Sequence, residues 1–267
     1  MKKTLSIVML FVLAFTMAMS VSAAKPVDGR KTCTAYIGEV ALDGKIDDAW
    51  EYAPVIKVDT VKQNASKWYG DKTKVAGKDY ATLDCKVLWD GKSTLYMLFV
   101  VKDKTISLVG KNPWDKDSCE FFIQLENSTD AKASKTQVRL LADGKNELGN
   151  VKFGYAKTAD GLVYEVAYDI SKVGGAGQYF GIDFQYNDDA EGKGVRNVCL
   201  GWSDSTDKAS SNASVYGQCL LSDKTVASVK AAAEAAKKES AKTADPAAML
   251  AVVMALSGAA AVVSKKR

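Results

Sequence analysis

Two residues in the stretch 111–123 have side chains suited to binding a polyhydroxylated ligand. Trp114 follows Pro113 among charged residues, which predicts a loop, and Glu120 interrupts the apolar run that comes next. An indole face can stack on the C–H face of a sugar ring, and an exposed indole is costly unless it binds something. The alternative is that the loop folds back and Trp114 plugs the core. The sequence leaves both open.

Two other segments place polar side chains two residues apart, at Gln137 and Arg139 and at Gln185 and Asn187. Residues two apart in a β-strand lie on the same face of a sheet. Together with Glu120, an arginine and several amides on one face can hydrogen-bond the vicinal hydroxyls of a sugar. The alternative is a solvated outer face with an arginine–carboxylate pair.

The sequence has no histidine. This excludes Ser-His-Asp and Cys-His triads, histidine general bases and histidine-ligated metal sites, and it disfavours a haem-carrying redox module. Carboxylates cluster in residues 115–120 and 188–191. Paired carboxylates about 5–10 Å apart hydrolyse glycosides, so a glycosidase is an alternative, but acidic loop clusters are more typical of solvated turns or calcium ligands. We therefore predict no enzyme and no cofactor, with structural calcium permitted.

Short β-strands must position these side chains. Between residues 30 and 222 the apolar residues form short runs separated by Asp-Gly turn signals. The runs cover residues 86–89, 95–102, 120–125, 137–141, 162–168, 179–186, 198–202 and 215–221. Only residues 46–52 predict a short helix, with Trp50 on its apolar side. Eight or more strands without intervening helices predict an all-β fold, an antiparallel β-sandwich of jelly-roll type.

The charge distribution argues against nucleic acid as a partner. The formal net charge is +4, from 36 basic and 32 acidic residues. Five of the basic residues lie at the two ends of the sequence, at Lys2, Lys3, Lys265, Lys266 and Arg267. The part between them is nearly neutral and has no basic stripe.

The first 24 residues have the composition of a secretory signal peptide. Lys2 and Lys3 are followed by an apolar stretch over residues 5–19 and by the small residues Val21-Ser22-Ala23. An uncleaved membrane anchor is the alternative. Export is therefore expected.

The C-terminal end also carries an apolar segment. Residues 247–263 contain no charge, which is about the lower limit for a membrane-spanning helix, and a basic tail follows that would stay in the cytoplasm. This end resembles a sortase-type cell-wall sorting signal of Gram-positive bacteria, with Lys242-Thr243-Ala244-Asp245 at the place of the cleavage motif. The usual Leu-Pro pair is replaced by Ser240-Ala241 and the usual glycine by Ala244.

The resemblance implies that Thr243 is joined to the cell wall. Without cleavage, residues 244–267 would anchor the protein in the membrane instead. Either outcome displays residues 30–222 outside the cell, on the surface of a Gram-positive bacterium. Residues 223–243, rich in alanine and lysine, are then a partly helical or disordered spacer.

The five cysteines lie mostly in apolar, strand-like runs, and no CxxC motif is present. Secreted proteins usually pair their cysteines, and an odd count leaves one over. Because a free cysteine behaves as a small buried hydrophobe, we predict that at least part of them are reduced core residues.

Several segments, taken in order, resemble the family 9 carbohydrate-binding modules that are appended to xylanases. They are LDGKIDDAW at 42–50, VLWD at 87–90, NPWDKDSCEFFI at 112–123, QVR at 137–139, GIDFQYND at 181–188 and GWSD at 201–204. The resemblance covers roughly residues 36–221. It implies an antiparallel β-sandwich that binds the reducing ends of β-linked chains of xylan or cellulose type, and it allows structural calcium.

In that family a sugar lies between two tryptophans. By the resemblance Trp114 matches the first, and polar contacts fall on Glu120, Arg139, Gln137 and Gln185. Two departures follow later in the sequence. An asparagine of the family is Asp207 here, and the second tryptophan is Ser210.

The loss of one stacking surface costs about 1 kcal/mol of binding free energy, so weaker or altered sugar binding is expected. The predicted function is non-catalytic binding of an oligosaccharide or polysaccharide at the cell surface. The alternative is a structural or adhesive surface protein whose sugar site has degenerated.

Overall fold

A computed structural model describes residues 25–63, 67 and 78–243. The predicted signal peptide and the predicted anchor in residues 244–267 lie outside the described residues. Within the described part of the chain, no helix is long and apolar enough to cross a membrane.

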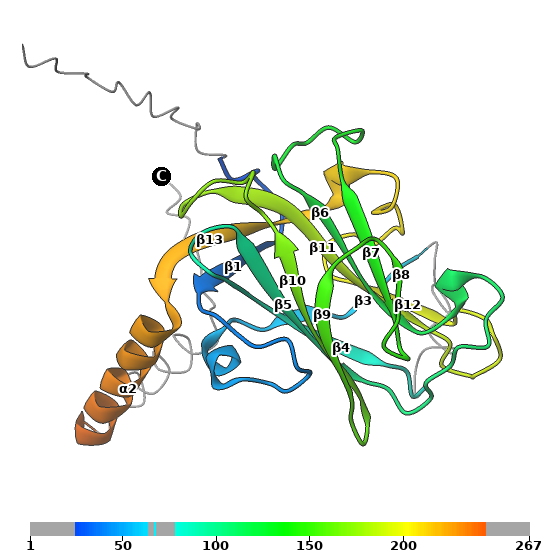
Figure 1. Ribbon diagram of the computed structural model, residues 1–267, viewed down its shortest axis with the longest axis horizontal. Coiled ribbons are helices and arrows are strands. Elements are labelled where there is room, and N and C mark those ends of the chain that lie inside the picture. The colour runs from blue at the N-terminus through cyan, green and yellow to red at the C-terminus, as the bar shows by residue number, and fades with distance from the viewer. Residues whose placement is uncertain (1–24, 64–66, 68–77, 244–267) are drawn as a thin grey trace, which may run out of the picture.

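Thirteen strands form the framework of the described part of the chain, and Figure 1 shows their arrangement. They are β1 (Thr32–Ile37), β2 (Ile56–Val58), β3 (Thr60–Val61), β4 (Thr82–Trp89), β5 (Thr94–Lys102), β6 (Ser118–Gln124), β7 (Thr136–Leu141), β8 (Asn146–Leu148), β9 (Lys152–Lys157), β10 (Gly161–Asp169), β11 (Tyr179–Asp188), β12 (Val198–Gly201) and β13 (Gly217–Thr225). The hydrogen-bonded order is β8-β7-β6-β11-β13-β1-β4-β5-β10-β9, with β12 beside β11, β3 beside β12 and β2 beside β4.

The strands form two layers that enclose one core. Phe99 of β5 packs against Phe121 of β6 and Phe184 of β11, with ring centroids 6.1 and 5.8 Å apart. Tyr168 of β10 meets Phe121 at 5.9 Å. These contacts place β6 and β11 opposite β5 and β10, so the predicted β-sandwich is confirmed.

The pairing departs from the antiparallel prediction at one strand. β1 lies between β13 and β4 and runs parallel to both, whereas the other pairs among the described residues are antiparallel. Antiparallel neighbours can be joined by a hairpin, but parallel neighbours require a long connection. The sequence between β1 and each of its partners supplies such a connection, and no local pattern signals it.

The outer face of β4, β5 and β10 is covered. The short 3-10 helix η1 (Asp48–Tyr52) buries Trp50, which packs on Leu88, Leu98 and Val163 and donates its Nε1–H to Glu165 at 2.9 Å. The prediction of a short helix with Trp50 in the core is confirmed. The segment around η1 therefore packs on part of the outer face of β4, β5 and β10.

A long helix follows β13 directly. Helix α2 (Val226–Thr243) covers the residues predicted to be a spacer. Its Ala233 is buried, and the Lys230 Nζ lies 5.9 Å from the centre of the Tyr52 ring. The first part of α2 therefore packs on η1.

Candidate functional site

Strands β7, β6 and β11 bring the predicted polar residues side by side. Alternation along β6 points Phe121 into the core and Glu120 to the outer face. Glu120 pairs in register with Arg139 on β7 and with Gln185 on β11. Three residues that are distant in sequence thus form one row across the sheet.

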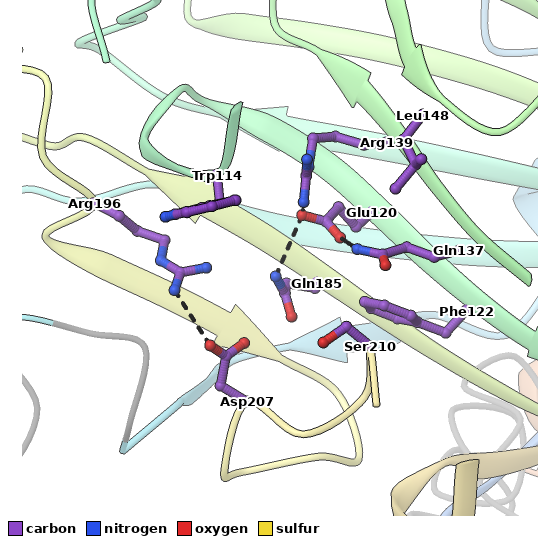
Figure 2. A pocket seen from close by; sticks show the side chains of 10 residues that line it. All are labelled: Trp114, Glu120, Phe122, Gln137, Arg139, Leu148, Gln185, Arg196, Asp207 and Ser210. Atoms are coloured by element: carbon purple, nitrogen blue, oxygen red, sulfur yellow. Dashed lines mark hydrogen bonds and ion pairs between the residues drawn. The ribbon is translucent and has the colours of Figure 1, made fainter. Parts of the chain in front are cut away.

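This row is the floor of a pocket of about 400 Å³ (Figure 2). The lining residues are Trp114, Glu120, Phe122, Gln137, Arg139, Leu148, Gln185, Arg196, Asp207 and Ser210. In Figure 2, Trp114 lies on one side of the pocket and Asp207 and Ser210 lie on the other, with Gln185 and the Arg196 guanidinium between them. The pocket therefore has one aromatic side and one polar side.

Glu120 is buried and tightly held. Its Oε2 accepts a hydrogen bond from Gln137 Nε2 at 2.6 Å, and its Oε1 accepts from Arg139 Nε at 2.8 Å and from Asn187 Nδ2 at 2.6 Å. The side chain is 1% exposed. Bonds from charged or amide donors at these distances are strong and directional, so the carboxylate is fixed before any ligand arrives.

Arg139 is held from two sides. Besides Glu120, its Nη1 donates to the Glu147 carboxylate at 2.9 Å. Burial alone would lower the pKa of the guanidinium, but Glu120 and Glu147 outweigh it and the pKa is raised. These bonds use two of the five N–H donors of an arginine, which leaves others to a ligand.

Trp114 is held out toward solvent by a closed loop. It lies in the 3-10 helix η2 (Pro113–Asp115), where Pro113 sets the backbone of the first turn. The ends of the loop are joined, since the Asp117 N–H donates to the Ser107 carbonyl at 2.9 Å and the Ser107 N–H donates to the Asp117 carboxylate at 2.6 Å. Trp114 is 46% exposed, so the alternative in which it plugs the core is wrong.

The polar side of the pocket, hereafter the polar wall, consists of Asp207 and Ser210. Both lie in the loop after β12, and Asp207 has a left-handed backbone with φ of 64°. The buried Asp204 carboxylate fixes this loop, accepting hydrogen bonds from the backbone N–H groups of Lys208 at 2.7 Å and Ala209 at 2.9 Å. The polar wall is therefore anchored to the core of the domain.

A fully buried lysine supports both the floor and the polar wall. Lys62 Nζ donates to Gln185 Oε1 at 2.6 Å and lies 3.2 Å from Asp204 Oδ2. Burial lowers the pKa of Lys62, but Cys199, Asp183 and Asp204 together outweigh it and the pKa is raised. Lys62 thus stays charged and sets the orientation of the Gln185 amide.

Arg196 completes the pocket near Trp114. Its Nη1 donates to Asn187 Oδ1 at 2.9 Å, and its Nη2 donates to Asp207 Oδ2 at 3.2 Å. The polar wall is thereby linked to the hydrogen-bond network beneath the floor.

Most of the residues predicted from the sequence meet here. Those that line the pocket are Trp114, Glu120, Gln137, Arg139, Gln185 and Asp207. Asn187 is fully buried beneath Glu120 and is not among the lining residues. Thr243 is the last described residue and ends α2.

Four residues of the site were not predicted from the sequence, namely Phe122, Leu148, Arg196 and Lys62. Phe122 and Leu148 could have been found by the two-residue alternation from Glu120 and by the hairpin after β7. Arg196 and Lys62 lie in segments without a pattern, and only the tertiary structure brings them to the site.

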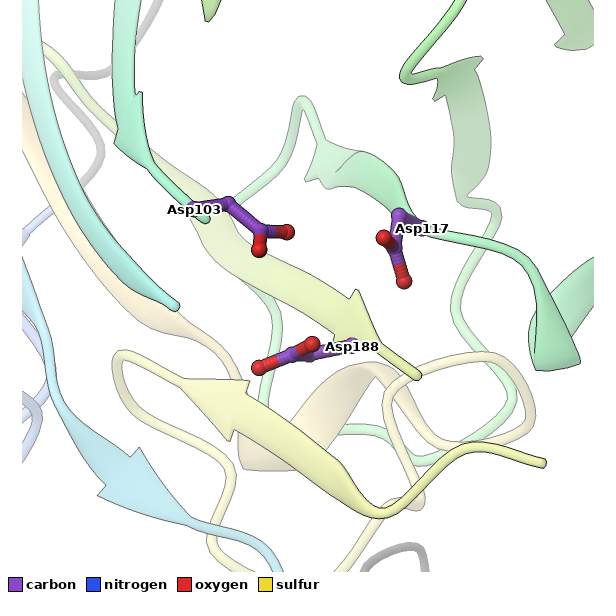
Figure 3. A group of neighbouring side chains, drawn as sticks. All are labelled: Asp103, Asp117 and Asp188. Carbon is purple, nitrogen blue, oxygen red and sulfur yellow. The ribbon is translucent and has the colours of Figure 1, made fainter. Parts of the chain in front are cut away.

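A separate cluster of carboxylates lies at the strand ends near the Trp114 loop (Figure 3). Asp103 follows β5, Asp117 precedes β6 and Asp188 ends β11. All three are buried, and one oxygen of each lies within 4.8 Å of the others. Asp188 Oδ2 accepts the Ala81 N–H at 2.7 Å, but its buried Oδ1 has no hydrogen-bond partner.

This arrangement disfavours ionised carboxylates without a cation. Burial raises the pKa of Asp117 to about 8 and that of Asp188 to about 7, and the negative charge of Asp103 acts in the same direction. Carboxylate oxygens are the ligands that Ca²⁺ prefers in proteins. The three residues and the unpartnered oxygen therefore fit a hard divalent cation.

A β-sandwich with an exposed tryptophan beside a floor of fixed hydrogen-bonding groups is typical of a carbohydrate-binding module. The sequence matches the family described as "Carbohydrate family 9 binding domain-like" over residues 42–224, and the chain belongs to this family. The resemblance stated from the sequence is thereby confirmed for the domain.

Curated relatives are larger enzymes. The chain is 31% identical over 196 residues to "Endo-1,4-beta-xylanase C" of Paenibacillus barcinonensis, which covers 70% of this chain and 17% of the xylanase. It is 30% identical over 203 residues to "Exoglucanase XynX" of Acetivibrio thermocellus, covering 73% of this chain and 17% of that protein. The chain therefore spans about a sixth of the length of these relatives.

Solved structures share the fold. A family 9 carbohydrate-binding module from Caldicellulosiruptor kristjanssonii, solved with glucose, superposes with a TM-score of 0.62 at 20% identity, covering 73% of this chain and 97% of the module. The structure of a module from the same organism with cellotriose gives the same TM-score and identity and covers 95% of that module. At this identity the likeness establishes the common fold.

Proposed function

We propose that the protein binds a neutral oligosaccharide in the pocket beside Trp114 and does not act on it chemically. The observation that carries the proposal is a half-exposed indole next to a buried carboxylate that already accepts hydrogen bonds from four side chains. A sugar C–H face would stack on Trp114, and sugar hydroxyls would complete the hydrogen bonding of Glu120 and Arg139.

The charges that line the pocket support a neutral ligand. Two carboxylates, Glu120 and Asp207, face two guanidinium groups, Arg139 and Arg196, and each carboxylate is ion-paired to one arginine. A carboxylate held in this way suits fixed hydrogen bonding better than proton transfer. The proposal therefore assigns no catalytic role to Glu120.

Calorimetric titration with xylo-, cello-, manno- and galacto-oligosaccharides tests this function, with chains reduced at the end as a comparison. Because its relatives are xylanases, chain ends of xylan and cellulose type are the reference ligands. Trp114→Ala is expected to abolish binding. Val109→Ala is the matched control, since Val109 is an apolar residue of the same loop, 70% exposed and outside the pocket lining.

Heat signals that vanish with Trp114→Ala and persist with Val109→Ala would support the proposal. No binding by a folded protein across the whole panel would refute it. The structural or adhesive alternative, motivated by Ser210 in place of a stacking residue, would then be preferred.

We also infer that the domain acts outside the cell, at its surface. The signal-like residues 1–24, the apolar residues 247–263 and the basic tail support this location, as does the relationship to xylanases. Fractionation of the source cells, with and without Thr243→Ala, tests it. Wall-bound protein that shifts to the membrane fraction in the variant would support attachment through Thr243, and protein found only inside the cell would refute the location.

A structural calcium ion held by Asp103, Asp117 and Asp188 is a further part of the proposal. The unpartnered, buried Asp188 Oδ1 supports it. Such an ion would tie the ends of β5, β6 and β11 together beneath the Trp114 loop. Calcium titration of the metal-free protein tests it, with Asp188→Asn expected to lose binding and Asp115→Asn, in the same loop but outside the cluster, expected to keep it.

A further inference from the structure

The two sides of the pocket differ in chemistry. Trp114 offers a flat apolar surface that is 46% exposed. The polar wall opposite it offers the Asp207 carboxylate, which is 27% exposed, and the exposed Ser210 hydroxyl (Figure 2). A ligand that fills the pocket therefore meets an aromatic surface on one face and hydrogen-bonding groups on the other.

The polar wall is rigid as well as polar. Asp204 holds the backbone of Lys208 and Ala209, and Lys62 neutralises Asp204 from below. Tyr216 Oη donates to the Ala209 carbonyl at 2.8 Å. The residues on both sides of Ser210 are thus fixed, because the Ser211 N–H also donates to the Lys208 carbonyl at 2.9 Å. Moving the loop to present an apolar surface would therefore require breaking several of these hydrogen bonds.

Sugars differ in how well they match such a pocket. In β-glucose and β-xylose every ring hydroxyl is equatorial, so both faces of the ring present C–H groups. One of those faces would lie against the polar wall, where its C–H groups cannot hydrogen-bond. A ring with one axial hydroxyl, as in galactose or mannose, has one apolar face and one face that carries a donor.

We propose that the pocket selects a hexopyranose with one axial hydroxyl, whose apolar face stacks on Trp114 and whose axial hydroxyl donates to the Asp207 carboxylate. This inference rests on the proposed function and refines it. Asp207 and Ser210 are then the residues that determine specificity, and Arg196 orients the Asp207 carboxylate.

Titration of the protein with the methyl β-glycosides of galactose, mannose, glucose and xylose tests the inference, because the α-anomer present in solutions of the free sugars would add an axial hydroxyl to every one of these rings. A hydrogen bond to a charged acceptor gives a preference of roughly tenfold or more, so galactose or mannose is expected to bind at least that much more tightly than glucose. Because galactose and mannose carry the axial hydroxyl at different ring positions, the tighter binder of the two shows which position faces Asp207.

A variant that adds a second apolar surface gives an independent readout. Ser210→Trp is expected to improve glucose and xylose binding roughly 2- to 10-fold, as one added stacking face would, and to weaken the preference for the axial sugar. Ser211→Trp is the matched control, since Ser211 is exposed but does not line the pocket.

The outcomes separate the inference from the proposed function. Glucose or xylose binding as tightly as galactose and mannose would overturn the inference and leave the proposed function intact. Binding of no sugar by a folded protein would overturn both. An axial preference that Ser210→Trp removes and Ser211→Trp keeps would support the inference.

Discussion

Glu120→Gln is the substitution that tests the architecture of the floor most directly. The change keeps the shape of the side chain but removes its charge and replaces one acceptor oxygen by an NH₂ group. That group would face either Gln137 Nε2, now 2.6 Å from Oε2, or the Arg139 Nε and Asn187 Nδ2 donors on Oε1. On the Oε1 side the NH₂ group would oppose two donors in a buried site, and on the Oε2 side it would require the Gln137 amide to turn over and present its oxygen.

The cost follows from the burial and the pairing. Breaking a buried ion pair by removing one partner costs about 3–5 kcal/mol. Arg139 keeps a second partner in Glu147, whose side chain is 31% exposed, so the expected loss is at the lower end, about 3 kcal/mol. For a domain of this size that corresponds to a fall in Tm of roughly 6–12 °C.

Urea unfolding and thermal unfolding measure this loss. Glu147→Gln is the matched control, because it removes the more exposed partner of the same arginine and is expected to cost less than about 1 kcal/mol. Sugar affinity, measured at a temperature where both variants are folded, should fall in Glu120→Gln and change little in Glu147→Gln. Equal stability losses for the two variants would refute the claim that Glu120 is the fixed centre of the floor.

Three other predictions concern the core and the cation site. Lys62→Met is expected to destabilise the protein by about 3–5 kcal/mol in urea unfolding, because it leaves buried carboxylates without their cationic partner. Lys57→Met removes an exposed ion pair and should cost less than about 1 kcal/mol. All five cysteines are free and buried, so thiol titration should find five thiols in denaturant and few without it, and fewer than five would indicate a disulfide. The raised pKa values of Asp117 and Asp188 mean that folding favours their protonated forms, so stability is present below the unfolded pKa and is lost as pH rises through about 7 and 8. With chelator, Tm should thus be higher at acidic than at mildly alkaline pH, calcium should reduce the difference, and a Tm that rises with pH would contradict this reasoning.

The longer strands could be read from the sequence because their local pattern is strong. Each of the eight predicted apolar runs coincides with a strand of the structure, from β4 to β7 and from β10 to β13, although the runs 120–125, 198–202 and 215–221 extend one or two residues beyond their strands. The missed strands are β1, β2, β3, β8 and β9. β2, β3 and β8 have only two or three residues. β1 and β9 have six each; β1 pairs with β13, far away in the sequence, and β9 pairs with the neighbouring β10.

The cluster of Asp103, Asp117 and Asp188 illustrates the same limit. The sequence pointed to acidic loops at residues 115–120 and 188–191, but the structure takes one carboxylate from each and adds Asp103. The end of β5 meets the ends of β6 and β11 only through the stacking of the two layers. No spacing in the sequence encodes that meeting.

By itself the sequence determined the layered β fold, the outward direction of Glu120, Arg139 and Gln185, and the loop position of Trp114. These features follow from period-two alternation and turn chemistry, which are local. Only the tertiary structure decided that Lys62 and Arg196 join the site and that a rigid polar wall faces Trp114. Lys62 contacts Gln185 and Asp204, which are more than 100 residues away in the sequence. Arg196 contacts Asn187 and Asp207, which are nearer in the sequence but lie on β11 and in the loop after β12. Such contacts are fixed by packing the whole domain.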